Sequence, residues 1–294
     1  GPFYTAAETK AGLADLGMNT STVDNYYGLT INIDNLSLPI VKFVSKGVSF
    51  PNGGGDLKSG TTYYVKPGKL IYLTTVFKSQ KVDMVTQYFK IGDQEGQPHA
   101  VDDYKSYFSH GTQKFTEWDS SGGVDWSANS TGDSASNANT NSSIRNAFSL
   151  NGSGDTWYAY AEARNENGNY YGGSSAEYAS MYQFTTDGDI PTFSGIPSTA
   201  WNNDDVVFTP TVNDSGSGIK KATIEVNGNL AQTITPSTRD TSVSFTARTV
   251  TGTATYVIDV EDNVGNITSR TFTVKKKKNA PTGNLAQTPT GDTN

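Results

Sequence analysis

The sequence predicts an all-β protein made of tandem β-sandwiches, and three observations support this fold class. Short apolar or alternating segments are separated by turns rich in Gly, Asn and Asp. Tyrosine (16) far outnumbers tryptophan (4), and charged residues make up only 17% of the chain. The phrase Ile190-Pro191-Thr192 returns as Ala280-Pro281-Thr282, and a repeat of about ninety residues indicates a row of similar small domains.

Residues 1–28 are expected to form an N-terminal segment with one short helix. Thr5 and Glu8 have the spacing of a capping box, in which the Thr hydroxyl and the Glu carboxylate each accept a hydrogen bond from a free backbone N–H of the first turn. Good helix formers follow as far as Leu16, and Gly17 is a natural C-cap.

Residues 29–188 are expected to form an elaborated β-sandwich with a long insertion at 92–150. Residues 119–143 are almost wholly Ser, Gly, Asn, Asp, Thr and Ala, and such length is unusual for a sandwich loop. The periodicity predicts strands over 29–33, 39–44, 61–65, 69–78, 157–163 and 178–186.

Residues 189–275 are expected to form a second, simpler sandwich, followed at 276–294 by a linker and the start of another repeat. Six or seven short strands in this length fit a Greek-key sandwich. Ile258 and Val260 face one side of their strand, while Asp259 and Glu261 face the other. The predicted strands are 205–211, 219–226, 230–235, 243–249, 256–261 and 269–274.

Residues 190–274 resemble the bacterial immunoglobulin-like repeats of Gram-positive cell-surface proteins and adhesins. The resemblance is carried by Pro191-Thr192, by the turn Asp214-Ser215-Gly216-Ser217-Gly218-Ile219, and by Asp262-Asn263-Val264-Gly265-Asn266 before the last strand. It implies an Ig-like Greek-key fold and an extracellular, cell-wall location. It implies no ligand, because such repeats occur in adhesins, S-layer proteins and extracellular glycosidases alike.

The composition argues against several classes of function. A net charge of −7 makes nucleic acid an unfavourable partner. Without cysteine there is no thiol chemistry and no disulfide, and two histidines with no Gly-x-Ser-x-Gly motif favour a protein that is not an enzyme. The chain has no run of 18 apolar residues, so we expect no membrane insertion within this segment. The Gly1-Pro2 start is typical of an expression-tag remnant, so we expect any secretion signal or anchor to lie outside the chain.

Aromatic residues in polar, loop-like sequence are the candidates for ligand binding. Exposed aromatic faces stack on sugar rings or anchor protein interfaces, although such residues also pack under long loops. A pair drawn from Glu117, Asp119 and Asp125 could instead serve a glycosidase, if two carboxylates faced each other across a cleft. The candidate ligand-binding residues are Trp118, Asp119, Asp125, Trp126, Tyr170 and Tyr171.

Calcium is the metal that the sequence favours. Acidic residues gather near the predicted boundary between the sandwiches, and carboxylate oxygens are the ligands calcium prefers. The alternative is that these are ordinary turn residues, because Asp is favoured in turns. The candidate ligands are Glu162, Glu166, Asp187, Asp189 and Asp214.

The leading hypothesis is a cell-surface adhesin segment, monomeric and part of a longer chain. Its N-terminal sandwich would bind a host or environmental glycan or surface protein, and its Ig-like domain would serve as a stalk. One alternative is a purely structural stalk or S-layer segment. Another is a carbohydrate-active enzyme or its accessory carbohydrate-binding module.

Overall fold

A computed structural model describes residues 40–92, 103–108, 114–118, 123–132, 137–168, 170–171 and 182–277, all within a compact unit that spans residues 40–294. These residues form strands, turns and loops, so the described part of the chain is all-β as the sequence predicts. It contains no helix long and apolar enough to cross a membrane. The predicted helix at 5–16 and the predicted strand at 29–33 lie outside the described residues.

The first sandwich is built from β1 to β13. Its strands are β1 (Val41–Ser49), β2 (Gly55–Ser59), β3 (Thr62–Val65), β4 (Ile71–Ser79), β5 (Met84–Gly92), β6 (Asp103–Phe108), β7 (Lys114–Trp118), β8 (Val124–Trp126), β9 (Thr131–Gly132), β10 (Asn141–Leu150), β11 (Thr156–Asn165), β12 (Tyr170–Tyr171) and β13 (Tyr182–Thr186).

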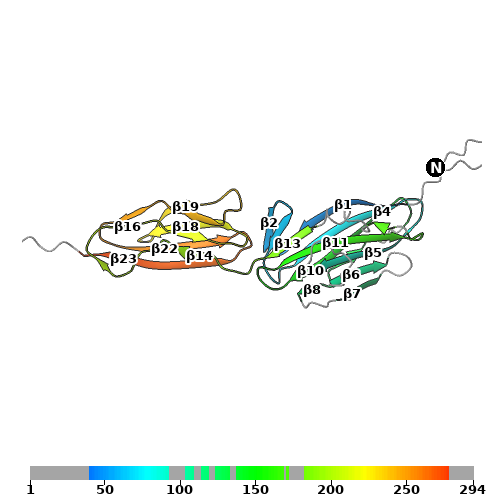
Figure 1. Ribbon diagram of the computed structural model, residues 1–294, viewed down its shortest axis with the longest axis horizontal. Coiled ribbons are helices and arrows are strands. Elements are labelled where there is room, and N and C mark those ends of the chain that lie inside the picture. The colour runs from blue at the N-terminus through cyan, green and yellow to red at the C-terminus, as the bar shows by residue number, and fades with distance from the viewer. Residues whose placement is uncertain are drawn as a thin grey trace, which may run out of the picture. The chain divides into compact units, whose positions relative to one another are not determined.

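These strands form two sheets that face each other across an apolar core (Figure 1). One sheet has the order β1-β4-β10-β8, with β9 beside β10, and the other has the order β2-β3-β13-β11-β5-β6-β7, with β12 beside β11. Strand β4 shows why the sheets pack: alternate residues from Ile71 to Ser79 are buried, and the residues between them are half-buried. Both sheets contribute to the core, for example through Leu73 and Phe148 from one and Phe89 and Phe184 from the other.

The second sandwich is built from β14 to β23. Its strands are β14 (Thr192–Ser194), β15 (Trp201–Asn202), β16 (Val206–Phe208), β17 (Thr211–Asn213), β18 (Ile219–Val226), β19 (Asn229–Ile234), β20 (Ser242–Ser244), β21 (Arg248–Val250), β22 (Thr253–Asp262) and β23 (Ile267–Lys276).

The larger sheet of the second sandwich has the order β15-β23-β22-β18-β19 (Figure 1). It faces the smaller sheets β14-β17-β20 and β16-β21 across its own core, which includes Val212, Ile224, Ile258 and Phe272. The predicted strand at 243–249 is divided into β20 and β21 around Phe245, whose side chain is turned into this core. All pairings among the described strands lie within β1–β13 or within β14–β23. The four segments expected from the sequence (1–28, 29–188, 189–275 and 276–294) keep their boundaries as predictions.

Candidate metal centre

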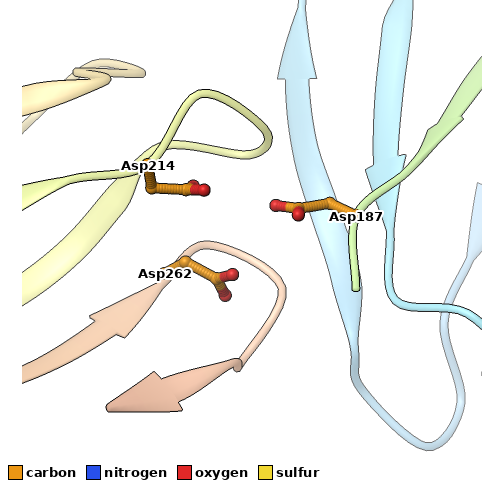
Figure 2. Close-up of side chains that lie close together, drawn as sticks. All are labelled: Asp187, Asp214 and Asp262. Atoms are coloured by element: carbon orange, nitrogen blue, oxygen red, sulfur yellow. The ribbon is translucent and has the colours of Figure 1, made fainter. Parts of the chain in front are cut away.

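Three buried aspartates, Asp187, Asp214 and Asp262, converge where the segment after β13 meets two turns of the second sandwich. These three residues are 2%, 4% and 0% exposed. Each offers a carboxylate oxygen that lies within 4.8 Å of those of the other two. Figure 2 shows Asp187 pointing from its segment toward the carboxylates of Asp214 and Asp262.

Asp187 is fixed by the end of the first sandwich. The backbone N–H of Thr186 donates to the Asp155 carbonyl (2.9 Å), and the N–H of Asp187 donates to the Val65 carbonyl (2.9 Å). The carboxylate then reaches the second sandwich, where Oδ2 accepts a hydrogen bond from the Ser217 N–H at 2.6 Å. Asp187 therefore joins the end of β13 to the turn that holds Asp214.

Asp214 occupies the turn between β17 and β18. Its Oδ2 accepts a hydrogen bond from the Gly218 N–H at 2.5 Å, and its Oδ1 accepts one from the Gly216 N–H at 3.3 Å. Gly218 has a φ of 85°, which an L-residue with a side chain rarely adopts. The repeated Gly-Ser sequence thus lets the chain curl around the Asp214 carboxylate.

Asp262 ends β22 and organises the turn before β23. Its Oδ1 accepts hydrogen bonds from the N–H groups of Val264 (3.0 Å) and Asn266 (2.7 Å), and its Oδ2 accepts one from Asn266 Nδ2 (2.7 Å). The same Asn266 Nδ2 donates to the Asp187 carbonyl at 3.1 Å. Asn266 thus connects Asp262 directly to the segment after β13.

Gly216 lets Asp187 come close to the second sandwich. A Cβ atom at residue 216 would lie 2.4 Å from the Asp187 Cγ, which is closer than two carbon atoms can approach. Only glycine leaves room for the carboxylate at this place. The turn sequence is therefore required by the contact as well as by its own backbone conformation.

Two described cationic side chains bind carbonyl oxygens of the turns that hold Asp214 and Asp262. Lys66 Nζ donates to the Gly265 carbonyl at 3.2 Å, and Arg239 Nε donates to the Gly216 carbonyl at 2.9 Å. The Arg239 guanidinium also lies 4.7 Å from the centre of the Tyr64 ring. Within the described residues, no Lys or Arg side chain forms an ion pair with the three aspartates.

Burial and mutual repulsion disfavour three ionised carboxylates at this place. Desolvation raises the pKa of Asp262 to about 6, while hydrogen bonds from Asn266 lower it and the charges of Asp187 and Asp214 raise it further. Desolvation, followed by the charge of Asp187, also raises the pKa of Asp214. A bound cation would relieve this repulsion, and so would a bound proton.

The donor set suits a hard divalent cation. Asp187, Asp214 and Asp262 offer only oxygen ligands, whereas zinc in proteins is most often held by His and Cys. Two oxygens on opposite sides of a calcium ion, each about 2.3–2.6 Å away, are separated by roughly 5 Å. The spacing of up to 4.8 Å between the carboxylate oxygens therefore fits a calcium ion between them.

The structure brings together two of the five metal ligands proposed from the sequence. Asp187 and Asp214 belong to the cluster, whereas Asp189 is exposed and donates its N–H to Asp187 Oδ1 at 3.2 Å. Glu162 lies within β11 and pairs with Lys90 on β5 at 3.3 Å. Glu166 follows the C-terminal end of β11, and Asp187 follows the C-terminal end of β13. Because β11 and β13 are antiparallel, the two residues lie at opposite ends of these strands.

Asp262 was not among the ligands proposed from the sequence, although its strand contained the signal. Ile258 and Val260 are buried and Asp259 is exposed, which confirms the expected alternation. Two residues beyond Val260, Asp262 falls on the same inward side of the strand. An aspartate on the core face of a strand needs partners for its charge, and this was the observation that could have identified it.

The proposed ligand-binding residues are dispersed over the first sandwich. Trp126 packs against the core, with its ring centre 5.9 Å from those of Phe89 and Phe148. It therefore fits a packing role better than that of an exposed stacking surface. Asp125 is exposed, and its Oδ2 accepts a hydrogen bond from Asn151 Nδ2 at 2.9 Å.

The remaining candidates are placed by their backbones or not at all. Trp118 ends β7 opposite Tyr104, and Tyr170 and Tyr171 form β12 beside β11, but the side chains of all three lie outside the described part. Asp119 also lies outside the described residues.

Comparison with known proteins finds solved structures of low sequence identity and low TM-score. The sequence matches no protein-family model and no curated protein. The chain is similar to fibronectin(III)-like modules of CbhA from Clostridium thermocellum, with 14% identity, coverage of 79% of this chain and 95% of that chain, and a TM-score of 0.30. A bacterial ice-binding adhesin of 1.5 MDa shares 12% identity over 81% of this chain and 64% of that chain, with a TM-score of 0.31. Titin domains Z1Z2 share 12% identity over 79% and 98%, with a TM-score of 0.23.

Proposed function

We propose that this chain is a stalk-forming segment of an extracellular bacterial surface protein, in which a calcium ion fixes the first sandwich to the second. Asp187, Asp214 and Asp262 would hold the ion. The observation that carries the proposal is the convergence of three buried aspartates, from both sandwiches, with no Lys or Arg ion pair among the described residues. Buried charges in folded proteins are normally paired or bound to a metal.

Calcium is preferred over other cations because of the ligands and the expected surroundings. Asp carboxylates and backbone carbonyls are oxygen donors, and calcium accepts six to eight of them in flexible geometry, whereas magnesium demands a near-ideal octahedron. Calcium sites in extracellular modules bind with Kd values of about 10⁻⁴–10⁻³ M. A site of that strength would be filled outside a cell and would stiffen the segment without further chemistry.

Recognition of a ligand is the second part of the proposal, and it concerns the first sandwich. The first sandwich has long connections between β5 and β10, and its short strand β12 lies beside β11. Binding surfaces usually lie on loops that a rigid scaffold positions. We propose that these loops bind a host or environmental glycan or surface protein, without catalysis. An array of glycans and matrix proteins, probed with the whole chain, tests this part. Absence of binding would leave the structural stalk.

The calcium site is tested by thermal melting and small-angle scattering of the whole chain, with calcium or with chelator. Because only the folded junction would bind the ion, calcium at 100 times Kd should stabilise it by about 2.7 kcal/mol. Asp187→Asn should abolish this response. Asp189→Asn removes the same charge from the same segment but at an exposed side chain, so it should respond like the parent. Identical melts and scattering curves in calcium and chelator would refute the site.

A further inference from the structure

The two sandwiches end in the same way. In the first, the last strand β13 pairs with the parallel strand β3, with Thr186 opposite Val65. In the second, the last strand β23 pairs with the parallel edge strand β15, with Lys276 opposite Asn202.

The hydrogen bonds beyond these pairs also correspond. The N–H of Asp187 donates to the Val65 carbonyl at 2.9 Å, and the N–H of Lys277 donates to the Asn202 carbonyl at 2.8 Å. The Asp187 and Lys277 positions are therefore equivalent. The repeated Pro-Thr at 191–192 and 281–282 gives the same correspondence from the sequence alone.

The same register makes Trp201 equivalent to Tyr64. Tyr64 lies opposite Thr185 and Trp201 lies opposite Lys275, in each case one residue before the pairs compared above. Tyr64 is half-buried and carries the Arg239 guanidinium of the next sandwich 4.7 Å from its ring centre. Trp201 is 57% exposed, and only Lys275 lies over its ring among the described residues, at 5.9 Å.

Residues Trp201, Asn202, Lys275, Lys276 and Lys277 form a surface that we name the distal face. We propose that the distal face is the docking surface for a further β-sandwich of the same repeat type, whose sequence begins at Ala280. In this contact Trp201 stacks on an arginine equivalent to Arg239, and Lys277 pairs with aspartates equivalent to Asp214 and Asp262.

The equivalent positions and the repeated Pro-Thr identify this occupant. In the preceding contact Asp187 meets two buried aspartates, Asp214 and Asp262, and at the distal face the equivalent residue is Lys277, whose charge is opposite to that of such a pair. A lysine side chain has two more bonds than an aspartate and reaches about 2.5 Å farther. From the position of Asp187, whose oxygen lies within 4.8 Å of both other carboxylates, an ammonium group would therefore reach them. The contact at the distal face needs no metal ion.

The decisive experiment appends a second copy of residues 193–277 after Thr282, which preserves the spacing between repeats. Each pairing of β14–β23 is internal to this part, and its core is its own, so the copy carries all it needs to fold. Labelling with 5-fluorotryptophan gives a ¹⁹F signal for Trp201, assigned by its loss in Trp201→Phe. In the extended chain this signal should show a smaller H₂O/D₂O solvent-isotope shift than in the 294-residue chain.

Two variants of the extended chain separate this contact from the proposed calcium site. Lys277→Ala should expose Trp201 again, whereas Lys221→Ala, which removes an exposed lysine on β18, should leave it protected. Protection should persist in chelator. A Trp201 signal that is equally exposed in both chains, or that ignores Lys277→Ala, would overturn the proposal. Absence of any calcium response in the parent chain, with Trp201 still protected, would overturn only the proposed calcium site.

A substitution in the 294-residue chain provides an independent test that does not depend on folding of the added copy. Asp187→Lys places the lysine of the distal face opposite Asp214 and Asp262. In chelator this variant should melt higher than Asp187→Met, which has a side chain of similar length without the charge. A lower or equal melting temperature for Asp187→Lys would show that this pair of aspartates does not accept a lysine, and would overturn the proposal.

Discussion

Asp262→Asn should stabilise the protein in chelator at neutral pH and destabilise it, relative to the parent, in calcium. Burial raises the pKa of the Asp262 carboxyl from 3.8 to about 6. The folded state therefore binds the proton of the Asp262 carboxyl more tightly than the unfolded state. The folding stability that this protonation contributes is complete below pH 3.8, falls as the pH rises to about 6 and remains lost above that value.

The expected magnitude follows from the same pKa. A rise of this size means that the ionised Asp262 carboxylate lowers the free energy of unfolding by about 3 kcal/mol at neutral pH. Asparagine removes the charge but keeps one oxygen for the N–H groups of Val264 and Asn266, while its own NH₂ then faces Asn266 Nδ2. That unfavourable contact costs about 1–2 kcal/mol. The net gain in chelator is therefore about 1–2 kcal/mol, or a few degrees in Tm.

Calcium should reverse the order of the two proteins. The parent gains about 2.7 kcal/mol at 100 times Kd, whereas the variant has lost a ligand and gains little. Differential scanning calorimetry at pH 7.5, in calcium and in chelator, measures both differences. Asp259→Asn, at an exposed position of the same strand, should follow the parent in both conditions. If Asp262→Asn is destabilised equally with and without calcium, Asp262 only shapes its turn and the reasoning is refuted.

Three further predictions concern packing. Gly216→Ala should destabilise by about 1–3 kcal/mol in urea unfolding, because its Cβ would overlap Asp187; Gly252→Ala, with open space around it, should be nearly neutral. Ile258→Ala should cost about 2–5 kcal/mol in the isolated fragment 189–277, since its side chain is fully buried; a fragment without a cooperative melt would contradict the domain boundary. Trp126→Ala should cost about 3–5 kcal/mol of stability, and a fully stable variant would contradict its packing role.

The fold was largely predictable because strand periodicity is a local property. The predicted strand at 219–226 agrees with β18, and the predicted strand at 69–78 agrees with β4 to within two residues. The division at Phe245 was not predictable, because the alternating sequence of 243–249 does not show where the chain must bend to place one ring in the core. The helix at 5–16 and the strand at 29–33 stay predictions, because they lie outside the described residues.

The candidate site was only partly predictable because it depends on strand direction. Proximity in sequence suggested Glu166 as a partner of Asp187, but β11 and β13 are antiparallel, so the two residues lie at opposite ends of these neighbouring strands. Asp262 lies 75 residues after Asp187 in the chain and joins it only through the turn before β23. Alternation along one strand identifies an inward aspartate, whereas its partners come from the tertiary structure.

The parallel pairing of β15 with β23 determines how the second sandwich would respond to a stretching force. β15 lies near the start of the second sandwich and β23 at its end, and both run in the same direction. Pulling the two chain ends apart therefore slides these strands past each other along their length. Their hydrogen bonds are then loaded together instead of opening one after another. We expect this domain to resist stretching more strongly than one whose terminal strands are peeled apart.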